Sequence, residues 1–287
     1  MTALSDRPGG PGVDGRATHA TRHHSGHRAQ GWTAHLAPIG LEELVETAAL
    51  LTRVDRKYVV PEQELPDLLA AVPERTRVLE IEGSRAFGYR SDYLDTPALD
   101  AFWLAGQGRR RRFKVRERTY LDTGTTYLEV KVPGPRGTNL KERVLRAHRG
   151  PLDDGEQQFL DERLRAARVP DHVRVEGLAP ALVSSYRRTT LLLAGDEPGT
   201  DSRATLDTDL VWALPGAHAS RLPVTDRVVV ETKTGSTPSA LDRLLWARGH
   251  RPVRISKFGT GLAALDPALP RLRWHRVLER DLGLPRR

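Results

Sequence analysis

The chain has 287 residues, no cysteine, and 45 lysines and arginines against 37 aspartates and glutamates, which gives a net charge of +8. The lack of cysteine excludes disulfides, thiolate metal sites and cysteine nucleophiles. Hydrophobic residues make up 38% of the chain, which is enough for a core, and neither a signal peptide nor a run of eighteen apolar residues is visible. We therefore expect a cytoplasmic protein with no membrane span.

The chain divides into three expected parts. Residues 1–36 are rich in Gly, Pro, Ser, Thr and His and lack apolar periodicity, which predicts a disordered tail. Residues 37–266 carry the periodic segments and form the expected domain, which opens with a helical pattern at 41–51. Residues 267–287 are expected to be a basic C-terminal tail or helix.

Short segments with alternating apolar and polar residues follow that helix and indicate β-strands. They lie at residues 54–60, 86–95, 111–120, 125–132, 184–193, 202–212 and 226–234. Helical patterns at 156–169 and 238–250 interrupt them, and Ser256 is a candidate N-cap for a last helix from Lys257. Many antiparallel strands with few helices predict an α+β protein built on a curled or closed sheet.

The expected strands carry their cations on one face, because successive side chains of a strand point to opposite faces. On any single strand, a charged face exposed to solvent is the simpler interpretation. Taken together, however, the charged faces would line the inside of a closed sheet with Lys114, Arg116, Arg118, Lys131, Arg188, Arg203 and Lys233. Without a ligand, these charges would repel one another strongly even at an effective dielectric of ~20. A small barrel admits only a slender ligand, so the pattern indicates phosphate.

Two Glu-x-Lys pairs, Glu129/Lys131 and Glu231/Lys233, are the candidate chemical centre. A carboxylate offers a hard oxygen ligand for Mg²⁺ or Mn²⁺, and a neighbouring lysine can hold a phosphate oxygen. The alternative interpretation is two local ion pairs on the face of a sheet. Near the C-terminus, Ser256 and Lys257 lie where the free N–H groups of a helix start attract anions.

The sequence resembles a known family through a series of short motifs in a fixed order. They are RKY at 56–58, FKVRERTY at 113–120, LEVK at 128–131, NLKERV at 139–144, SYRRT at 185–189, RATLDTD at 203–209, VVETK at 229–233 and ISKFGTG at 255–261. Over residues 41–266 the chain resembles the VTC domain, the polyphosphate polymerase domain of the vacuolar transporter chaperone family within the triphosphate tunnel metalloenzymes. All six lysines of the chain fall inside these motifs.

The resemblance implies a closed antiparallel barrel of about eight strands with flanking helices, a triphosphate tunnel in which the γ-phosphate of ATP is added to a polyphosphate chain with Mn²⁺ or Mg²⁺. The implied catalytic residues are Lys57, Arg116, Arg118, Lys131, Lys233 and Lys257. The implied phosphate-binding residues are Lys114, Lys141, Tyr186, Arg188, Arg203, Arg254 and Ser256. Glu231 is the implied metal ligand, and the other Glu-x-Lys pair adds Glu129. Arg254 replaces a lysine, which keeps the charge and changes the geometry.

Two other functions stay open. The first is a tripolyphosphatase or nucleoside triphosphatase of the same fold; hydrolytic relatives carry E-x-E-x-K in the first strand, where residues 53–57 of this chain offer only Asp55. The second is a non-catalytic binder of polyphosphate or another polyanion. Aromatic residues are only 6% of the chain, so no nucleic acid partner is expected. ATP and inorganic polyphosphate are the expected partners.

Overall fold

The computed structural model describes residues 31–47, 54–134, 139–148, 150–195, 200–216 and 220–286. The strands are β1 (Ala37–Ile39), β2 (Val54–Pro61), β3 (Arg77–Leu79), β4 (Phe87–Asp95), β5 (Lys114–Tyr120), β6 (Thr126–Pro133), β7 (Asn139–Arg146), β8 (Ala179–Leu193), β9 (Ser202–Ala213), β10 (Arg221–Pro223) and β11 (Arg227–Thr234). The α-helices are α2 (Leu41–Thr47), α3 (Leu65–Ala70), α4 (Asp100–Gly106), α5 (Asp154–Ala166), α6 (Ala240–Ala247) and α7 (Lys257–Leu265). Single helical turns lie at Glu62–Glu64, Val175–Gly177, Leu272–Trp274 and Val277–Asp281.

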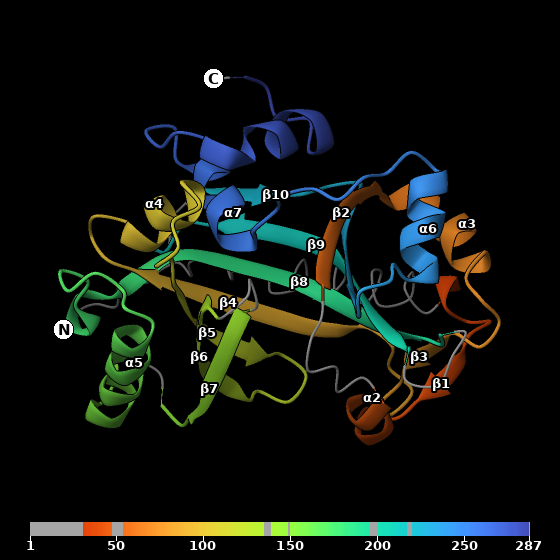
Figure 1. The fold of residues 1–287 in the computed structure, drawn as a ribbon, viewed down its shortest axis with the longest axis horizontal. Coiled ribbons are helices and arrows are strands. Elements are labelled where there is room, and N and C mark those ends of the chain that lie inside the picture. The colour runs from red at the N-terminus through yellow and green to blue at the C-terminus, as the bar shows by residue number, and fades with distance from the viewer. Residues whose placement is uncertain are drawn as a thin grey trace, which may run out of the picture.

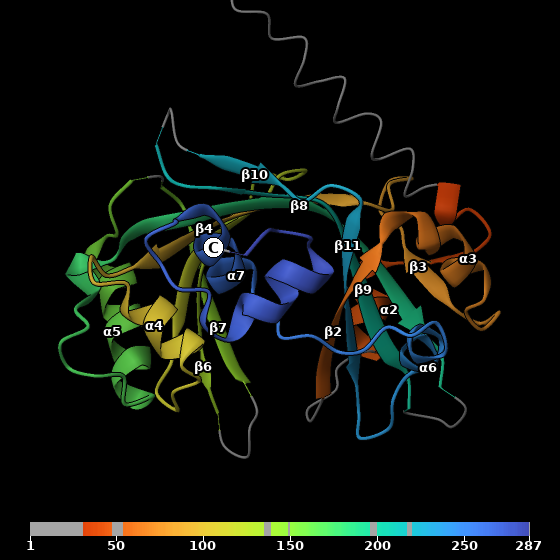
Figure 2. The same ribbon diagram turned by 90° about the horizontal axis from the view of Figure 1, so that it is seen from above.

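One antiparallel ladder forms the body of the sheet, in the order β2-β11-β9-β8-β4-β5-β6-β7. Strand β3 joins β8 and pairs in parallel with β1, while β10 extends β9. The long strand β8 spans the molecule, with β4 to β7 on one side and β9, β11 and β2 on the other (Figures 1 and 2). The two arms curl toward each other, so the sheet has a concave inner face and a convex outer face.

The expected closed barrel of about eight strands is wrong in two respects. The sheet has eleven strands, and within the described residues no backbone ladder joins β2 to β7, the two ends of the order. Closure would need one more antiparallel ladder along β7. Strand β7 pairs with β6, its one partner strand in the part of the chain that the structure describes. It leaves Lys141, Glu142, Arg143 and Leu145 exposed, a charged edge of the kind that discourages further pairing.

Helices cover the outer face on both arms. On the β2–β11–β9 arm, Tyr58, Val60, Val228 and Val230 are fully buried in one apolar cluster with leucines of α3 and α6. On the other arm, α4 and α5 pack over β4 to β6 in a second cluster. On β2, β5, β6 and β11 these apolar residues alternate with Lys57, Arg116, Lys131 and Glu231, which therefore face inward.

Helix α7 lies on β8 and β9, and two of its glycines allow it to pack closely. A Cβ atom on Gly259 would lie 2.1 Å from the ring of Trp274, and one on Gly261 would lie 2.5 Å from the ring of Trp212. Trp274 belongs to the C-terminal segment, which was expected to be a tail or helix. It forms a 3-10 turn and a π-helical turn, and its Trp274 and Leu278 are buried in the same cluster as α7.

At the other end of the chain, the expected disordered tail at 1–36 mostly falls outside the described residues. Its last six residues are described, and among them Thr33 and Leu36 are buried, so the packed part of the protein begins before residue 37. In the part of the chain that the structure describes, no helix has the length and apolar character needed to cross a membrane.

Candidate functional site

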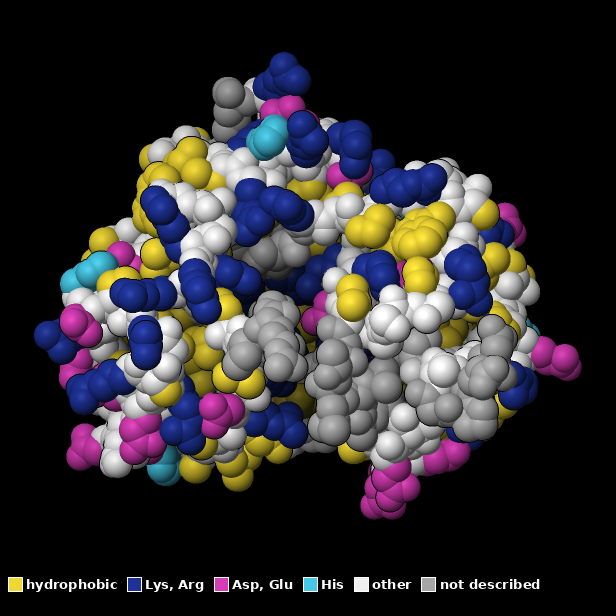
Figure 3. Space-filling view, viewed as in Figure 1, with side chains coloured by type: hydrophobic (Ala, Val, Ile, Leu, Met, Phe, Trp, Pro, Cys, Tyr) yellow, Lys and Arg dark blue, Asp and Glu magenta, His cyan; other side chains and the backbone are white. Residues whose placement is uncertain are grey.

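Strand register places most of the sequence-predicted site residues on the inner face of the sheet. Glu231 of β11 lies opposite Lys57 of β2 on one side and Thr205 of β9 on the other, and Lys233 lies opposite Arg203. On the far arm, Arg116 of β5 lies opposite Glu129 of β6, Arg118 opposite Tyr127, and Lys114 opposite Lys131, which itself faces Lys141 of β7. Figure 3 shows Lys and Arg side chains gathered around a central hollow in the molecule.

Asp207 joins β8, β9 and α7 on this face. Its carboxylate is fully buried and accepts from Arg188 Nε at 2.6 Å and Nη2 at 2.8 Å, and also from Lys257 Nζ. Burial raises the pKa of Asp207, but the charges of Arg188 and Lys257 outweigh it and hold the pKa below its usual value. Lys257 Nζ lies 4.4 Å from the centre of the Tyr186 ring, close enough for a cation–π contact.

Glu129 plays the same part on the β5–β7 arm. It is 2% exposed, and its Oε2 accepts from Arg116 Nε at 2.8 Å and Nη2 at 2.6 Å, while Lys141 Nζ lies 2.7 Å from Oε1. Burial opposes ionisation of Glu129, yet the neighbouring cations Arg116, Arg118 and Lys141 lower its pKa to about 2. Both carboxylate oxygens are therefore engaged by cations of the protein.

Three lysines lie side by side across β5, β6 and β7. Lys114 and Lys131 are direct cross-strand neighbours, and so are Lys131 and Lys141. Burial, with repulsion from nearby cations, lowers the pKa of Lys114 well below its ordinary value and also lowers that of Lys131. Among the described residues, no carboxylate forms an ion pair with Lys114 or Lys131. Like charges placed directly opposite destabilise a sheet, so a bound anion could stabilise this row of lysines.

Glu231 is held more loosely than Glu129 or Asp207. Its Oε1 lies 3.8 Å from Lys57 Nζ and 3.6 Å from Lys233 Nζ, which is beyond hydrogen-bond distance. Despite burial, Lys57 and Lys233 hold its pKa well below the usual range, so the carboxylate is charged. The hydroxyl of Thr205, directly opposite, is buried and has no hydrogen-bond partner within the described part of the chain. Two hard oxygens with unfilled coordination thus lie together here.

That arrangement fits a divalent cation better than the surroundings of Glu129 do. Mg²⁺ is commonly bound through one or two carboxylates together with water and substrate phosphates. In the described residues, no cluster of three or more histidines or carboxylates could hold a metal by itself. Glu231 could therefore hold a metal that phosphate oxygens complete, whereas the oxygens of Glu129 are already occupied.

Ser256 links α7 to the row of lysines. Its hydroxyl caps α7 by accepting from the Gly259 N–H at 3.2 Å and also accepts from Lys114 Nζ at 3.1 Å. The sequence prediction of a helix beginning at Lys257 with Ser256 as N-cap is confirmed. Arg254 is exposed, as Lys141 is, and it belongs to no strand, so strand register does not place it on the inner face.

Sequence reasoning missed two residues of this face. Asp207 lies two and four residues after Thr205 and Arg203, so the period of two gives its direction, but nothing in the sequence shows that two cations converge on it. Tyr93 of β4 is buried beneath the charges, with Lys114 Nζ 5.7 Å and Arg116 Cζ 5.8 Å from its ring centre. In the sequence, nothing about Tyr93 indicates a role in the site apart from its position in an expected strand.

The fold and the site define an α+β protein with a curled antiparallel sheet and a strongly basic inner face that encloses a few paired carboxylates. The sequence model of the VTC domain matches residues 52–266, about three quarters of the chain, and the chain belongs to this family. No curated protein matches the chain.

Several solved structures are similar. A candidate adenylate cyclase from Bacillus halodurans has a TM-score of 0.40 and 13% identity, over 71% of this chain and 94% of that chain. One from Vibrio parahaemolyticus has a TM-score of 0.36 and 16% identity, over 69% and 87%. A third candidate cyclase, from Hippeastrum, is described as revealing a dominant triphosphatase activity; its TM-score is 0.38 and its identity 16%, over 77% and 100%.

Proposed function

We propose that the protein is a polyphosphate polymerase that uses ATP. A terminal oxygen of a polyphosphate chain attacks the γ-phosphorus of ATP, the bond between that phosphorus and the β–γ bridging oxygen breaks, and ADP leaves. The chain grows by one phosphate in each cycle. Phosphoryl transfer of this kind asks the protein mainly to position the two reactants and to neutralise their charge, since the acceptor chain is itself the nucleophile.

The observation that carries the proposal is the row formed by Lys114, Lys131 and Lys141. Three neighbouring ammonium groups, of which two lack an ion-paired carboxylate in the described structure, would be relieved by a linear ligand with one negative charge or more per phosphate. Membership of the VTC domain family supports the same ligand class. A location in the cytoplasm, where ATP is supplied, belongs to this proposal.

The two arms of the sheet would hold the two reactants. Lys57 and Lys233 beside Glu231, together with Arg188, Arg203 and Lys257, would bind the triphosphate of ATP on the β2–β11–β9 side. Arg116, Arg118 and the lysine row would bind the acceptor chain on the β5–β7 side, and Tyr186 lies between them with its OH accepting from Arg118 Nη2 at 3.0 Å. Lys233 and Lys257 would stabilise the negative charge that moves to the leaving diphosphate.

Glu231 is the residue that would hold Mn²⁺ or Mg²⁺, with Thr205 beside it. A bound divalent cation would supply charge neutralisation on the triphosphate oxygens. Within this proposal Glu129 is not a metal ligand and instead holds Arg116 and Lys141 in place.

The test is an assay of the purified protein with ATP and Mn²⁺ or Mg²⁺, followed by gel analysis of phosphate chains and a parallel assay of free orthophosphate. The expected result is a ladder of long chains, with one ADP released for each phosphate incorporated. Orthophosphate alone would show a hydrolase, and binding of polyphosphate without ATP consumption would show a non-catalytic binder. Arg165→Gln, which removes one exposed arginine of α5, is a control and should give the same products as wild type.

A further inference from the structure

A second group of cations continues the lysine row beyond the sheet. Lys114 is the first residue of β5, and its Nζ contacts Ser256 Oγ at 3.1 Å. Two residues before each of them, the chain carries Arg112 and Arg254. The intervening residues, Phe113 and Ile255, are 2% and 7% exposed and point into the core. Arg112 and Arg254 therefore lie one step further out along the two segments that meet where Lys114 contacts Ser256.

Arg273 joins these two arginines from the C-terminal segment. Its Nη1 donates to the carbonyl of Ala105 in α4 at 3.3 Å, and a Cβ atom on Gly108 would lie 3.2 Å from the same nitrogen. Burial, and the nearby charges of Arg254 and Arg112, lower the pKa of Arg273, so each of these two arginines lies close enough to Arg273 to repel it. We call Arg112, Arg254 and Arg273 the outer arginine cluster.

The outer arginine cluster lacks acidic partners. Arg112 donates through Nη1 only to the carbonyl of Arg109, at 3.1 Å, and the side-chain hydrogen bond of Arg273 also goes to a backbone carbonyl. Within the described ranges, no carboxylate forms an ion pair with any of the three. Arg163 and Arg280, by contrast, pair with Glu142 and Asp281. Grouped guanidinium groups with free donors are suited to phosphate oxygens.

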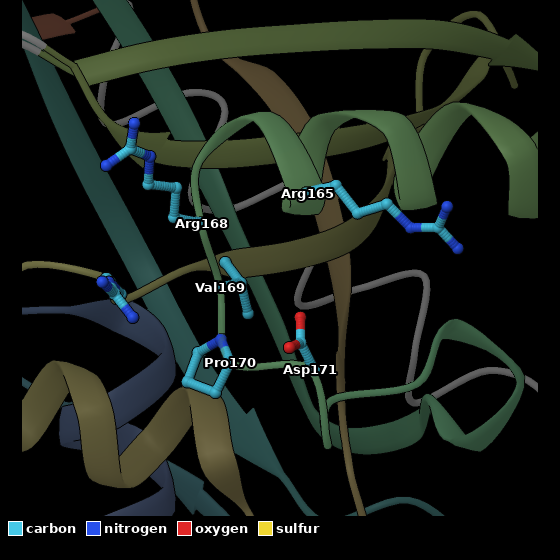
Figure 4. A pocket seen from close by; sticks show the side chains of 6 residues that line it. Arg165, Arg168, Val169, Pro170 and Asp171 are labelled. Carbon is cyan, nitrogen blue, oxygen red and sulfur yellow. The ribbon is translucent and has the colours of Figure 1, made fainter.

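A neighbouring pocket shows the contrast. Arg111, Arg165 and Arg168 line a pocket of about 520 Å³ together with Asp171 (Figure 4). Arg165 pairs with Asp161 at 2.6 Å, and Figure 4 shows its guanidinium directed away from Asp171. This pocket contains a carboxylate and has one of its arginines already neutralised, so we assign no ligand to it.

We propose that the outer arginine cluster is an extension subsite that binds the part of a polyphosphate chain reaching past Lys114, so that the protein holds long chains more tightly than triphosphate. The proposal rests on the proposed function, because it takes the inner face as the site of the first phosphates. The resemblance to the VTC domain implies phosphate binding by Arg254; Arg112 and Arg273 are new members of the site.

The test compares the affinities of inorganic triphosphate and of long-chain polyphosphate for wild type and for the double variant Arg112→Gln/Arg273→Gln. We expect triphosphate affinity to change less than twofold and long-chain affinity to fall about tenfold or more. The slope of log affinity against log salt for the long chain should decrease by about one per arginine removed. Arg165→Gln/Arg168→Gln removes the same charge nearby and should change neither ligand.

Two further results separate the possible failures. Arg112→Lys/Arg273→Lys keeps the charge and should keep the preference for long chains, and thermal unfolding of every variant checks that it is folded. A double Gln variant that loses both ligands equally, or neither, would overturn the subsite and leave the proposed function standing. A wild-type protein that binds neither ligand would overturn the proposed function itself.

Discussion

At the scale of single residues, Glu129 and Glu231 show how one motif can serve two purposes. Both precede a lysine by two positions on an apolar-backed strand, and the sequence does not distinguish them. In the fold, Glu129 is saturated by Arg116 and Lys141, whereas Glu231 stays more than 3.5 Å from its two lysines. The first carboxylate organises cations, and the second keeps its oxygens available to a ligand.

This difference predicts separate effects for Glu231→Gln. The amide keeps the shape but loses the charge that a divalent cation needs, so metal-dependent turnover should fall to background while triphosphate still binds with affinity equal to or above that of wild type. Turnover with Mn²⁺ and triphosphate binding by calorimetry are the measurements. Glu142→Gln, on the exposed edge strand, is the control and should turn over normally. Normal turnover in Glu231→Gln would contradict the assignment.

Glu129 instead predicts a stability effect with a definite sign. Its pKa is lowered from 4.5 to about 2 in the folded protein, so its contribution to stability is present above pH 4.5 and is lost as the pH falls through about 2. The difference corresponds to about 3 kcal/mol. Urea unfolding from pH 5 to pH 2 should show this loss in wild type, and Glu129→Gln should be destabilised at neutral pH and lack that part of the pH dependence. Parallel profiles in the two proteins would refute the assignment.

Lys233 predicts a pH dependence of binding. Burial lowers its pKa to about 8 in the ligand-free protein, so the ammonium is lost as the pH rises through that value. A bound phosphate favours the charged form, and binding near pH 8 should therefore take up protons and weaken as the pH goes from 7 to 9. Calorimetry in buffers of different ionisation enthalpy measures this uptake. Lys233→Arg should flatten the dependence only in part, because Lys141 also has a pKa of about 8. Equal slopes would contradict the role of Lys233.

At the scale of elements, α7 connects packing to the site. Its N-terminus carries Ser256 and Lys257, and its position depends on the close approach of Trp212 and Trp274 to Gly261 and Gly259. The glycines of the ISKFGTG motif thus serve packing, while its polar residues serve the inner face. A shift of α7 would move Lys257 away from Asp207 and Ser256 away from Lys114.

Gly259→Ala tests this coupling. A methyl group 2.1 Å from the Trp274 ring cannot be accommodated without movement, and overpacking of this kind costs about 1–3 kcal/mol. We expect a lower free energy of unfolding together with weaker triphosphate binding, measured by urea unfolding and calorimetry. Gly177→Ala, where no atom lies within 4 Å of the added Cβ, should be close to wild type in both. Unchanged triphosphate binding in Gly259→Ala would show that the position of α7 does not affect the site.

The sequence predicted those elements that have strong local patterns. All seven expected strands are present, as β2, β4, β5, β6, β8, β9 and β11. Strand β7 was not expected, because its sequence NLKERVLR has no alternation of apolar and polar residues. It is a strand because its backbone pairs with β6. The helix expected at 41–51 is present as α2 at Leu41–Thr47, and residues 48–51 lie outside the described part of the chain. Of the apolar stripe within α2, Leu44 is buried, while Leu41 and Val45 are exposed.

At the scale of the whole molecule, the period of two gives the face on which Lys131, Arg188 and Lys233 lie, since alternation is a property of each strand by itself. Closure of the sheet was not predictable in this way, because it depends on whether two strands far apart in sequence share a ladder, and β2 and β7 share none within the described ranges. The ion pairs of the site could not be predicted from the sequence either. The convergence of Arg188 and Lys257 on Asp207 needs three elements in their final places.

The repulsion between neighbouring lysines of the sheet predicts that removing the charge of Lys131 makes the ligand-free protein more stable and weakens its binding of phosphate. Lys131 lies between Lys114 and Lys141, so Lys131→Met should raise the free energy of unfolding of the ligand-free protein by on the order of 1 kcal/mol. Wild type should gain about 2.7 kcal/mol from triphosphate at a hundred times its Kd, and at that same concentration the variant should gain much less. Thermal unfolding with and without triphosphate measures both effects, and Arg165→Met is the control. A variant that is less stable without ligand, yet equally stabilised by it, would show that the row of lysines is not held in place for phosphate.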